Sequence, residues 1–589
     1  MAIRFLKSRA IAALAGLAVL TGPMTPVASR PIAKPASVRN MPYPGGPVRC
    51  NRSDLDVYGQ PRWQGGYVGT QGGAPMPAPQ STAPAPPPMV KRSMDSAIGR
   101  IAPPYPYPGP YPQPPREERE RYAGQAVASI KSVTSDPVST FSVDVDTGSY
   151  ANVRRFLTQG QQPPVAAVRT EEMLNYFRYD YPMPKDPSRP FSVTTDMSTT
   201  PWNLDTRLLR VGIRGYDLAQ GQRPATNLVF LVDVSGSMMS QDKLPLVKSA
   251  LSMLADRLTS RDKVSIVVYA GAAGIVLEPT SNANHVKAAL DCLQSGGSTA
   301  GGQGLELAYA TAKAHFVKGG VNRVILATDG DFNVGISSDE GIEAIVKRNR
   351  EAGITLTTLG FGQGNYNEAM MEKIADIGNG NYAYIDSALE AQKVLDEEME
   401  STLFTIAKDV KIQIEFNPRA VKEYRLIGYE NRVLAEEDFN NDRVDAGDIG
   451  AGHQVTALYE IVPTGAKSWQ PERRYQTGTA PSVASSTPAA EIAWLKLRYK
   501  LPGGDRSMLI EQPVSAQQMQ AARAPTGDMA FAVAVAGFGQ KLRGDKYLGT
   551  FSFADVRRLA GGQHDYLRAE FVKLAALADS QGGHGDGRE

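Results

Sequence analysis

Residues 221–407 alternate between short apolar runs and longer stretches with helical periodicity. The apolar runs resemble strands that are buried on both faces of a sheet, and they cover residues 228–232, 264–269, 324–327 and 354–360. The amphipathic stretches between them cover residues 244–258, 286–293, 304–316 and 341–350. This alternation predicts an α/β domain with a doubly wound, mostly parallel sheet, similar to a Rossmann fold.

The segments on either side of this domain have different patterns. Residues 117–220 combine strand-like and helical runs, which predicts a small α/β region; these runs cover 141–145, 151–157, 168–177 and 208–213. Residues 408–580 begin with strand-like runs and end with helical periodicity; the strand-like runs cover 410–416, 424–429, 455–461 and 492–499. The second segment is therefore expected to be β-rich, with helices at its end.

The first residues are typical of an export signal. Arg4, Lys7 and Arg9 precede the charge-free stretch 10–22, and small residues follow at 27–29. We therefore expect residues 1–29 to be a signal peptide and the mature protein to be periplasmic, associated with the cell surface, or secreted. No later run reaches 18 apolar residues, so we expect no transmembrane segment after removal of the signal.

A proline-rich segment follows the predicted signal peptide. Residues 31–115 hold half of the 42 prolines of the chain and show no apolar periodicity. Such a composition cannot build a core, so residues 30–116 are expected to form an extended, disordered linker. The glycine-rich residues 581–589 are expected to form a disordered tail.

Charge and cysteine content exclude several kinds of function. The 589 residues include 63 Lys and Arg and 61 Asp and Glu, which leaves a formal charge of +2. This balance gives no field that would attract a phosphate backbone, so nucleic acid is not an expected partner. Two cysteines and five histidines offer no zinc-binding spacing. Cys292 lies beside Leu290 and Leu293 on a predicted helix, where we expect a buried thiol.

A short polar motif follows the first buried strand. Asp233, Ser235 and Ser237 alternate in the loop between this strand and the next helix. Ligands of open parallel sheets bind at the carboxyl ends of the strands, which is where this loop is expected. One carboxylate and two hydroxyls supply only oxygen ligands, which suit a hard cation such as Mg²⁺.

This motif resembles the metal-ion-dependent adhesion site of the von Willebrand factor type A (VWA) domain. That site combines D-x-S-x-S with a distant Thr and a distant Asp, which Thr299 and Asp329 match here. The resemblance implies that Ser235, Ser237 and Thr299 bind Mg²⁺ (or Mn²⁺ or Ca²⁺) through their hydroxyls. It also implies that Asp233 and Asp329 bind directly or through water, and that a partner protein supplies an acidic residue to the open position.

The resemblance extends beyond the central domain. Several segments are similar to the regions that flank the VWA domain in a family of exported bacterial VWA proteins; these segments are 139–147, 150–157, 171–177, 424–432 and 450–460. Together with the central domain they cover roughly residues 130–580. The chain is therefore expected to have the flanking regions of that family as well as its VWA domain.

The expected function is non-enzymatic, metal-dependent protein binding in the envelope or in adhesion. One alternative is an envelope hydrolase that uses the metal site or Asp146, because Asp146, Thr147 and Gly148 match the D-T-G loop of aspartic proteases. Ser240 and Lys243 match the S-x-x-K of penicillin-binding enzymes, but no K-T-G follows. A second alternative is a structural scaffold in which the ion only stabilises the fold.

Overall fold

The computed structural model describes residues 120–582, except for 186–188, 298, 300, 331–338, 365, 472–489 and 505. The predicted signal peptide and linker lie outside the described residues. So do residues 583–589 of the predicted tail, whereas α13 (Tyr566–Gly582) includes its first two residues. All of the described residues belong to one structural unit.

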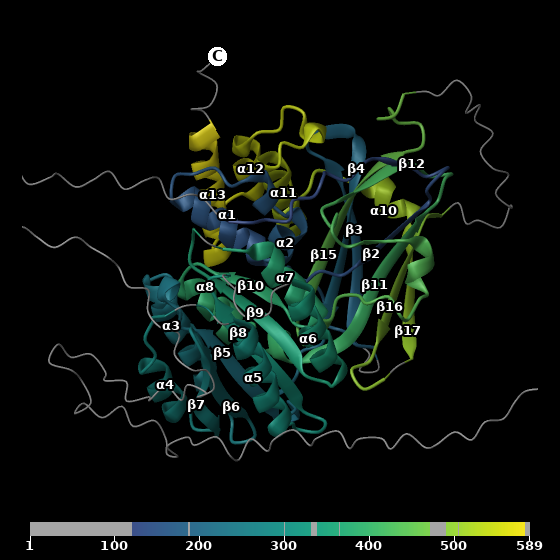
Figure 1. The fold of residues 1–589 in the computed structure, drawn as a ribbon. Helices are drawn as coiled ribbons and strands as arrows, with labels where there is room; N and C mark the ends of the chain where they lie inside the picture. Colours follow the sequence, from purple (N-terminus) through teal and green to yellow (C-terminus); the bar gives the residue numbers. More distant parts are fainter. Residues whose placement is uncertain are drawn as a thin grey trace, which may run out of the picture. The chain divides into compact units, whose positions relative to one another are not determined.

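The centre of the described chain is a mostly parallel, six-stranded sheet, as the apolar runs predict (Figure 1). Its strands are β5 (Thr226–Asp233), β6 (Lys263–Tyr269), β7 (Ala273–Thr280), β8 (Val321–Thr328), β9 (Thr355–Phe361) and β10 (Tyr382–Ile385). They are arranged in the order β10-β9-β8-β5-β6-β7, and β7 is antiparallel to β6. Sequence analysis misses β7 and β10 because β7 is a half-exposed edge strand and β10 has only four residues.

Helices cover both faces of this sheet. One face carries α3 (Leu244–Asp256) and α4 (Ala283–Asp291), and the other carries α5 (Gly301–Ala314), α6 (Asp339–Glu351) and α7 (Glu368–Ile377). Neighbouring residues of β5 point into the two different cores: Phe230 packs on the α3 side and Leu231 on the α5 side. Burial on both faces explains why β5 reads as an unbroken apolar run, and it confirms the doubly wound fold.

The regions before and after the central domain share two further sheets. The strands before it are β1 (Lys131–Ser132), β2 (Val138–Ser142), β3 (Phe191–Thr200) and β4 (Asn203–Gly215). Those after it are β11 (Thr405–Phe416), β12 (Val421–Ile427), β13 (Val433–Leu434), β14 (Ile449–Gly450), β15 (Gln454–Pro463), β16 (Glu491–Lys500) and β17 (Ser507–Ser515). One sheet has the order β1-β12-β15-β4-β3 and the other β13-β2-β11-β16-β17. The central domain is therefore inserted between strands that pair with one another.

The two shared sheets pack face to face around aromatic side chains. Phe416 of one sheet stacks on Tyr424 of the other, with ring centroids 4.4 Å apart. Phe191 and Tyr499 meet edge to face at 5.3 Å. Such pairs bury large apolar areas and favour one relative placement of the sheets.

A helical layer covers the outer face of the first shared sheet. It contains α1 (Gly148–Thr158), α2 (Thr170–Asn175), α11 (Gly527–Leu542), α12 (Phe553–Ala560) and α13, while the short α10 (Ala516–Ala521) packs on β3. Phe177, Phe531 and Phe571 are in mutual contact in this layer and share one apolar core with Leu458 of the sheet. The N-terminal and C-terminal helices thus form one core with the sheet.

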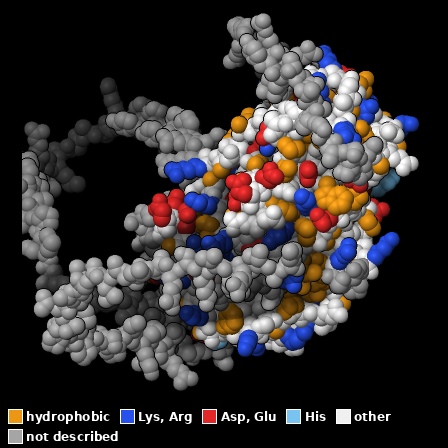
Figure 2. All heavy atoms as spheres, turned by 90° about the vertical axis from the view of Figure 1, so that its right-hand side faces the viewer, with side chains coloured by type: hydrophobic (Ala, Val, Ile, Leu, Met, Phe, Trp, Pro, Cys, Tyr) orange, Lys and Arg blue, Asp and Glu red, His pale blue; other side chains and the backbone are white. Residues whose placement is uncertain are grey.

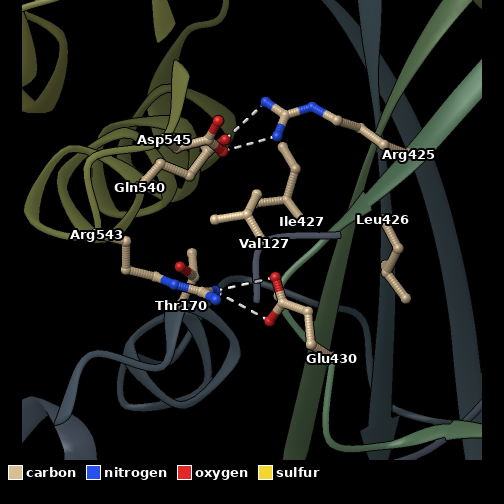
Figure 3. Close-up of a pocket in the computed structure, with 10 residues that line it drawn as sticks. Val127, Thr170, Arg425, Leu426, Ile427, Glu430, Gln540, Arg543 and Asp545 are labelled. Atoms are coloured by element: carbon tan, nitrogen blue, oxygen red, sulfur yellow. Dashed lines mark hydrogen bonds and ion pairs between the residues drawn. The ribbon is translucent and has the colours of Figure 1, made fainter. Parts of the chain in front are cut away.

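Buried ion pairs fix the C-terminal helices to this sheet (Figure 3). Arg425 of β12 donates to Asp545, which lies just after α11, at 2.8 Å, and to Glu460 of β15, also at 2.8 Å. Arg543 donates to Glu430 at 2.9 Å on the other side of a cavity of about 10 Å³. Removal of one partner would leave a buried charge unpaired, which is strongly destabilising.

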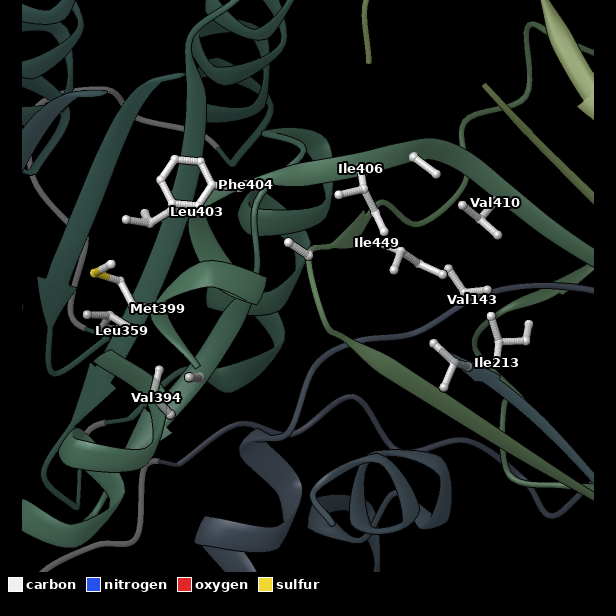
Figure 4. Close-up of a cluster of buried hydrophobic side chains, with 14 of the residues drawn as sticks. Val143, Ile213, Leu359, Val394, Met399, Leu403, Phe404, Ile406, Val410 and Ile449 are labelled. Carbon is white, nitrogen blue, oxygen red and sulfur yellow. The ribbon is translucent and has the colours of Figure 1, made fainter. Parts of the chain in front are cut away.

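The apolar core is continuous from the central domain into the shared sheets (Figure 4). α8 (Ala388–Gln392), a π-helical turn (Lys393–Glu397) and α9 (Met399–Leu403) lead from β10 to β11. Leu403 packs in the central domain. Ile406, three residues later, lies near Ile449 of β14 and in the same core as Val143, which directly follows β2. The two parts of the molecule are therefore joined by packed side chains.

The surface shown in Figure 2 mixes both signs of charge with apolar side chains. No single-sign field covers this face, in line with the formal charge of +2 of the whole chain. In the described ranges, we find no helix with the length and apolar character needed to span a bilayer.

One expectation about cysteine is wrong. Cys292 caps α4, is partly exposed and is disulfide-bonded, so it is not a buried thiol. The only other cysteine of the chain, Cys50, lies outside the described residues. Helical periodicity placed Cys292 near an apolar face, but periodicity carries no information about its covalent partner.

Candidate metal centre

Asp233 is the last residue of β5 and its carboxylate is held by three donors. Oδ1 accepts the Ser235 N–H at 2.9 Å, and Oδ2 accepts the hydroxyls of Thr328 at 2.9 Å and Tyr269 at 3.1 Å. The side chain is fully buried. Burial, with a contribution from the nearby charge of Asp329, raises the pKa of Asp233 to about 6. The carboxylate is thus fixed in orientation where its negative charge lacks a full solvent shell.

Ser235 and Ser237 present their hydroxyls side by side in the loop that follows. Their Oγ atoms lie 3.0 Å apart. Ser235 is buried, and Ser237 is exposed at the start of the 3₁₀ turn Gly236–Met239. The loop therefore carries one buried and one exposed serine whose hydroxyls are within hydrogen-bond distance of each other.

The loop that leads to Thr299 is attached to this serine loop by two backbone hydrogen bonds. Gly296 N–H donates to Val234 C=O at 2.8 Å, and Gly236 N–H donates to Gly297 C=O at 3.0 Å. Gly297 has φ +84°, a left-handed conformation that glycine adopts without strain. Thr299 follows two residues later and is partly buried. These bonds bring the segment of the predicted threonine ligand to the loop of Asp233, Ser235 and Ser237.

Asp329 follows β8, which pairs in parallel with β5, so both aspartates lie at the same edge of the sheet. Its carboxylate is 1% exposed, and Oδ2 accepts a hydrogen bond from Lys243 Nζ at 2.8 Å. Sequence analysis gives Lys243 no role in the site. The sequence gives no signal of this contact beyond the position of Lys243 soon after the Asp233 motif.

Acidic, histidine and cysteine side chains alone do not form a metal site here. Among the described residues, no group of three or more of these side chains is arranged to hold an ion. A cation at this rim would therefore depend on the hydroxyls of Ser235, Ser237 and Thr299 in addition to the two aspartates.

Asp146, the residue of the hydrolase alternative, lies elsewhere and is buried. Its Oδ1 accepts the Tyr382 N–H at 2.8 Å, and its Oδ2 pairs with Arg432 at 3.1 Å. Burial and the neighbouring Asp144 and Asp376 raise its pKa well above the usual range. The residue is 2% exposed, so its carboxylate is enclosed by protein rather than presented at the surface.

Comparison with known proteins agrees with this architecture. The von Willebrand factor type A domain model matches residues 227–398, a von Willebrand factor model matches residues 116–210, and a model of the C-terminal region of YfbK matches residues 401–580. The uncharacterised protein YfbK of Escherichia coli (strain K12) is 50% identical over 463 residues, which cover 76% of this chain and 79% of YfbK. This chain belongs to the YfbK family of VWA proteins. The matched models cover its VWA domain and most of both flanking regions.

More distant relatives match the VWA region. A UPF0353 protein of Mycolicibacterium vanbaalenii is 30% identical over 191 residues, which cover 28% of this chain and 57% of that protein. Among solved structures, a von Willebrand factor type A protein of Catenulispora acidiphila has a TM-score of 0.36 and 17% identity, and covers 68% of this chain and 91% of its own. BatB of Bacteroides thetaiotaomicron has a TM-score of 0.26 and 27% identity, and the match covers 29% of this chain and 96% of BatB.

Proposed function

We propose that this chain is an exported, non-enzymatic binding protein that captures a partner protein through a divalent cation. Asp233, Ser235, Ser237, Thr299 and Asp329 would hold Mg²⁺ (or Mn²⁺ or Ca²⁺), and an acidic side chain of the partner would complete the shell. The observation that carries this proposal is the pair of serine hydroxyls beside an immobilised carboxylate at the carboxyl edge of the sheet.

The hydroxyl spacing fits a magnesium shell. Neighbouring ligands of an octahedron with Mg–O distances of about 2.0–2.1 Å lie about 3 Å apart. The Oγ atoms of Ser235 and Ser237 are 3.0 Å apart. Hydroxyl and carboxylate oxygens are also the donor types that hard cations prefer.

When bound, the cation would act as an electrophile that accepts a carboxylate of the partner. Neighbouring residues orient the side chains that would bind the cation. The hydroxyls of Thr328 and Tyr269 and the Ser235 N–H donate hydrogen bonds to the Asp233 carboxylate and fix its orientation. The hydroxyl ligands complete the shell without adding negative charge, so the ion would remain able to accept an acidic group as a ligand.

The disulfide at Cys292 supports export. Disulfides persist in oxidising compartments and are rare in the cytosol. The N-terminal sequence independently predicts a signal peptide. On these two grounds we propose that the mature protein acts in the periplasm, at the cell surface, or outside the cell.

Isothermal titration calorimetry of the full mature chain with Mg²⁺ and Mn²⁺ tests the metal centre. Ser237→Ala removes an exposed hydroxyl ligand and should weaken binding at least tenfold, while Asp233→Asn should abolish it. Ser240→Ala is the matched control, because Ser240 lies in the same loop but bonds to Asp242. Equal heats for Ser237→Ala and the unsubstituted chain, or no heat in either, would refute the proposal.

The shared sheets favour a structural scaffold as a second candidate. They bind the VWA domain into one packed unit in which an ion could act only as a stabiliser. In that case Mg²⁺ would raise the melting temperature, but immobilised protein would capture no envelope protein in a metal-dependent way. Metal-dependent capture that is lost in Ser237→Ala would decide for the binding function.

A further inference from the structure

Lys243 lies against the candidate metal centre and is almost completely enclosed. Its side chain is 8% exposed, and Nζ donates to Asp329 Oδ2 at 2.8 Å. Lysine is seldom buried in proteins unless it is paired. The ammonium is paired here with one of the two carboxylates proposed as metal ligands.

Hydrogen bonds fix the backbone of Lys243, and a neighbouring loop packs against its side chain. Lys243 N–H donates to Ser240 C=O at 3.1 Å, and its C=O accepts the Val247 N–H at 2.9 Å at the start of α3. The aliphatic stem packs on Gly362, where an added Cβ would lie 2.3 Å from Lys243 Cγ. Lys243 therefore cannot withdraw from Asp329 without repacking against the loop after β9.

This arrangement changes the charge of the centre. With both carboxylates ionised, Asp233, Asp329 and Lys243 together carry one negative charge, so a divalent cation would leave one net positive charge. Without Lys243 the same cation would leave the centre neutral. A neighbouring ammonium repels the incoming cation, and the excess positive charge attracts an incoming carboxylate.

We propose that Lys243 tunes the metal centre: it weakens the binding of the divalent cation and keeps the loaded centre electropositive, so that the centre selects a ligand with a carboxylate. This inference rests on the proposed metal centre. It adds a specificity-determining residue that contacts a metal ligand and is itself no ligand.

A purely structural ion pair makes a different prediction. If Lys243 only neutralised a buried aspartate, its removal would lower the thermal stability and leave the metal affinity of the folded fraction unchanged. Cation affinity and carboxylate affinity therefore separate the two roles. Stability alone does not separate them.

The test uses Lys243→Met in the full mature chain, which removes the charge and keeps an unbranched stem. Calorimetry with Mn²⁺ should give a dissociation constant at least tenfold lower than that of the unsubstituted chain. Acetate then serves as a carboxylate probe. Its binding to the Mn²⁺-loaded protein is measured by water-proton relaxation. Half-maximal acetate binding should require at least threefold more acetate in Lys243→Met.

Two further variants keep the test decisive. Lys248→Met removes a lysine of α3 whose Nζ donates to Asp291 C=O rather than to Asp329, and it should leave both constants within twofold. Lys243→Gln retains a hydrogen-bond donor for Asp329 without the charge. If Lys243→Met fails to fold, Lys243→Gln replaces it, with the same expected changes in Mn²⁺ and acetate binding. Circular dichroism melts without metal identify folded variants.

The outcomes separate this inference from the proposed function. Tighter Mn²⁺ and weaker acetate binding in the Lys243 variants support the inference. Mn²⁺ binding that is unchanged or weaker in folded Lys243 variants overturns it and leaves the metal centre standing. No Mn²⁺ binding in any variant, the unsubstituted chain included, overturns both.

Discussion

Glu171 is a buried carboxyl group, and it makes a testable prediction about pH. It lies on α2, is 1% exposed, and its Oε2 has no hydrogen-bond partner within the described ranges. Burial is the main cause that raises the pKa of Glu171 from 4.5 to about 8, and the charges of Glu430, Asp144 and Glu172 add to it. At neutral pH the folded protein therefore keeps a proton that the unfolded chain releases.

The sign of the effect follows from proton linkage. Between pH 4.5 and 8 the folded state binds more protons at Glu171 than the unfolded state, so the free energy of unfolding falls as the pH rises. One proton difference changes this free energy by about 1.4 kcal/mol per pH unit. Glu171 should therefore cost about 2 kcal/mol of stability between pH 5 and pH 7.

Glu171→Gln removes this titration and keeps the shape of the side chain. Urea unfolding at pH 5 and pH 7 should show that the variant gains about 2 kcal/mol relative to the unsubstituted chain over this interval. Glu437→Gln, at an exposed position, is the control and should give the same difference at both pH values. The reasoning is refuted if the difference between Glu171→Gln and the unsubstituted chain does not change with pH.

Three further predictions concern stability and the disulfide. Arg425→Met leaves Glu460 and Asp545 buried without their cation and should lower the unfolding free energy by about 3–5 kcal/mol in urea titrations; a loss below 1 kcal/mol would contradict this. Gly362→Ala forces a Cβ against Lys243 at φ +71° and should cost about 1–3 kcal/mol in the same assay, and an unchanged midpoint would be inconsistent with the close packing. Mass spectrometry of non-reduced, exported protein should find Cys292 in a disulfide, whereas alkylation of Cys292 without reductant would show that it is free.

The central sheet could be predicted because its signals are local. β5 is buried on both faces and reads as an unbroken apolar run, and the polar motif that starts at Asp233 follows it directly. β10 of the same sheet has only four residues, and β17 of a shared sheet contains Pro513. Neither gives a pattern that separates a strand from a loop. Strand length and edge position therefore set the limit of what alternation reveals.

The pairing of strands and of charges could not be predicted from the same patterns. Alternation marks β2 and β11 as strands, but nothing local shows that Ser142 pairs with Lys411, across the whole VWA domain. The contact of Lys243 with Asp329 likewise depends on the adjacency of β5 and β8. The types and order of Asp233, Ser235, Ser237, Thr299 and Asp329 suggest the candidate site from the sequence alone, and its metal binding stays a prediction. The charge of Lys243 beside it required the tertiary structure.

The insertion of the VWA domain determines how the candidate metal centre is connected to the rest of the molecule. α9 ends at Leu403 and β11 begins at Thr405, so no flexible linker separates the domain from the shared sheets on that side. Arg169, from the N-terminal flank, pairs with Glu372 of α7 at 2.7 Å, and α7 follows the loop whose Gly362 packs on Lys243. A ligand bound at the rim would therefore have a fixed orientation relative to the shared sheets, because the contacts between them are packed and charged. Binding and stability experiments need the full chain for the same reason, since an excised domain would lose the cations that neutralise the buried carboxylates of α7.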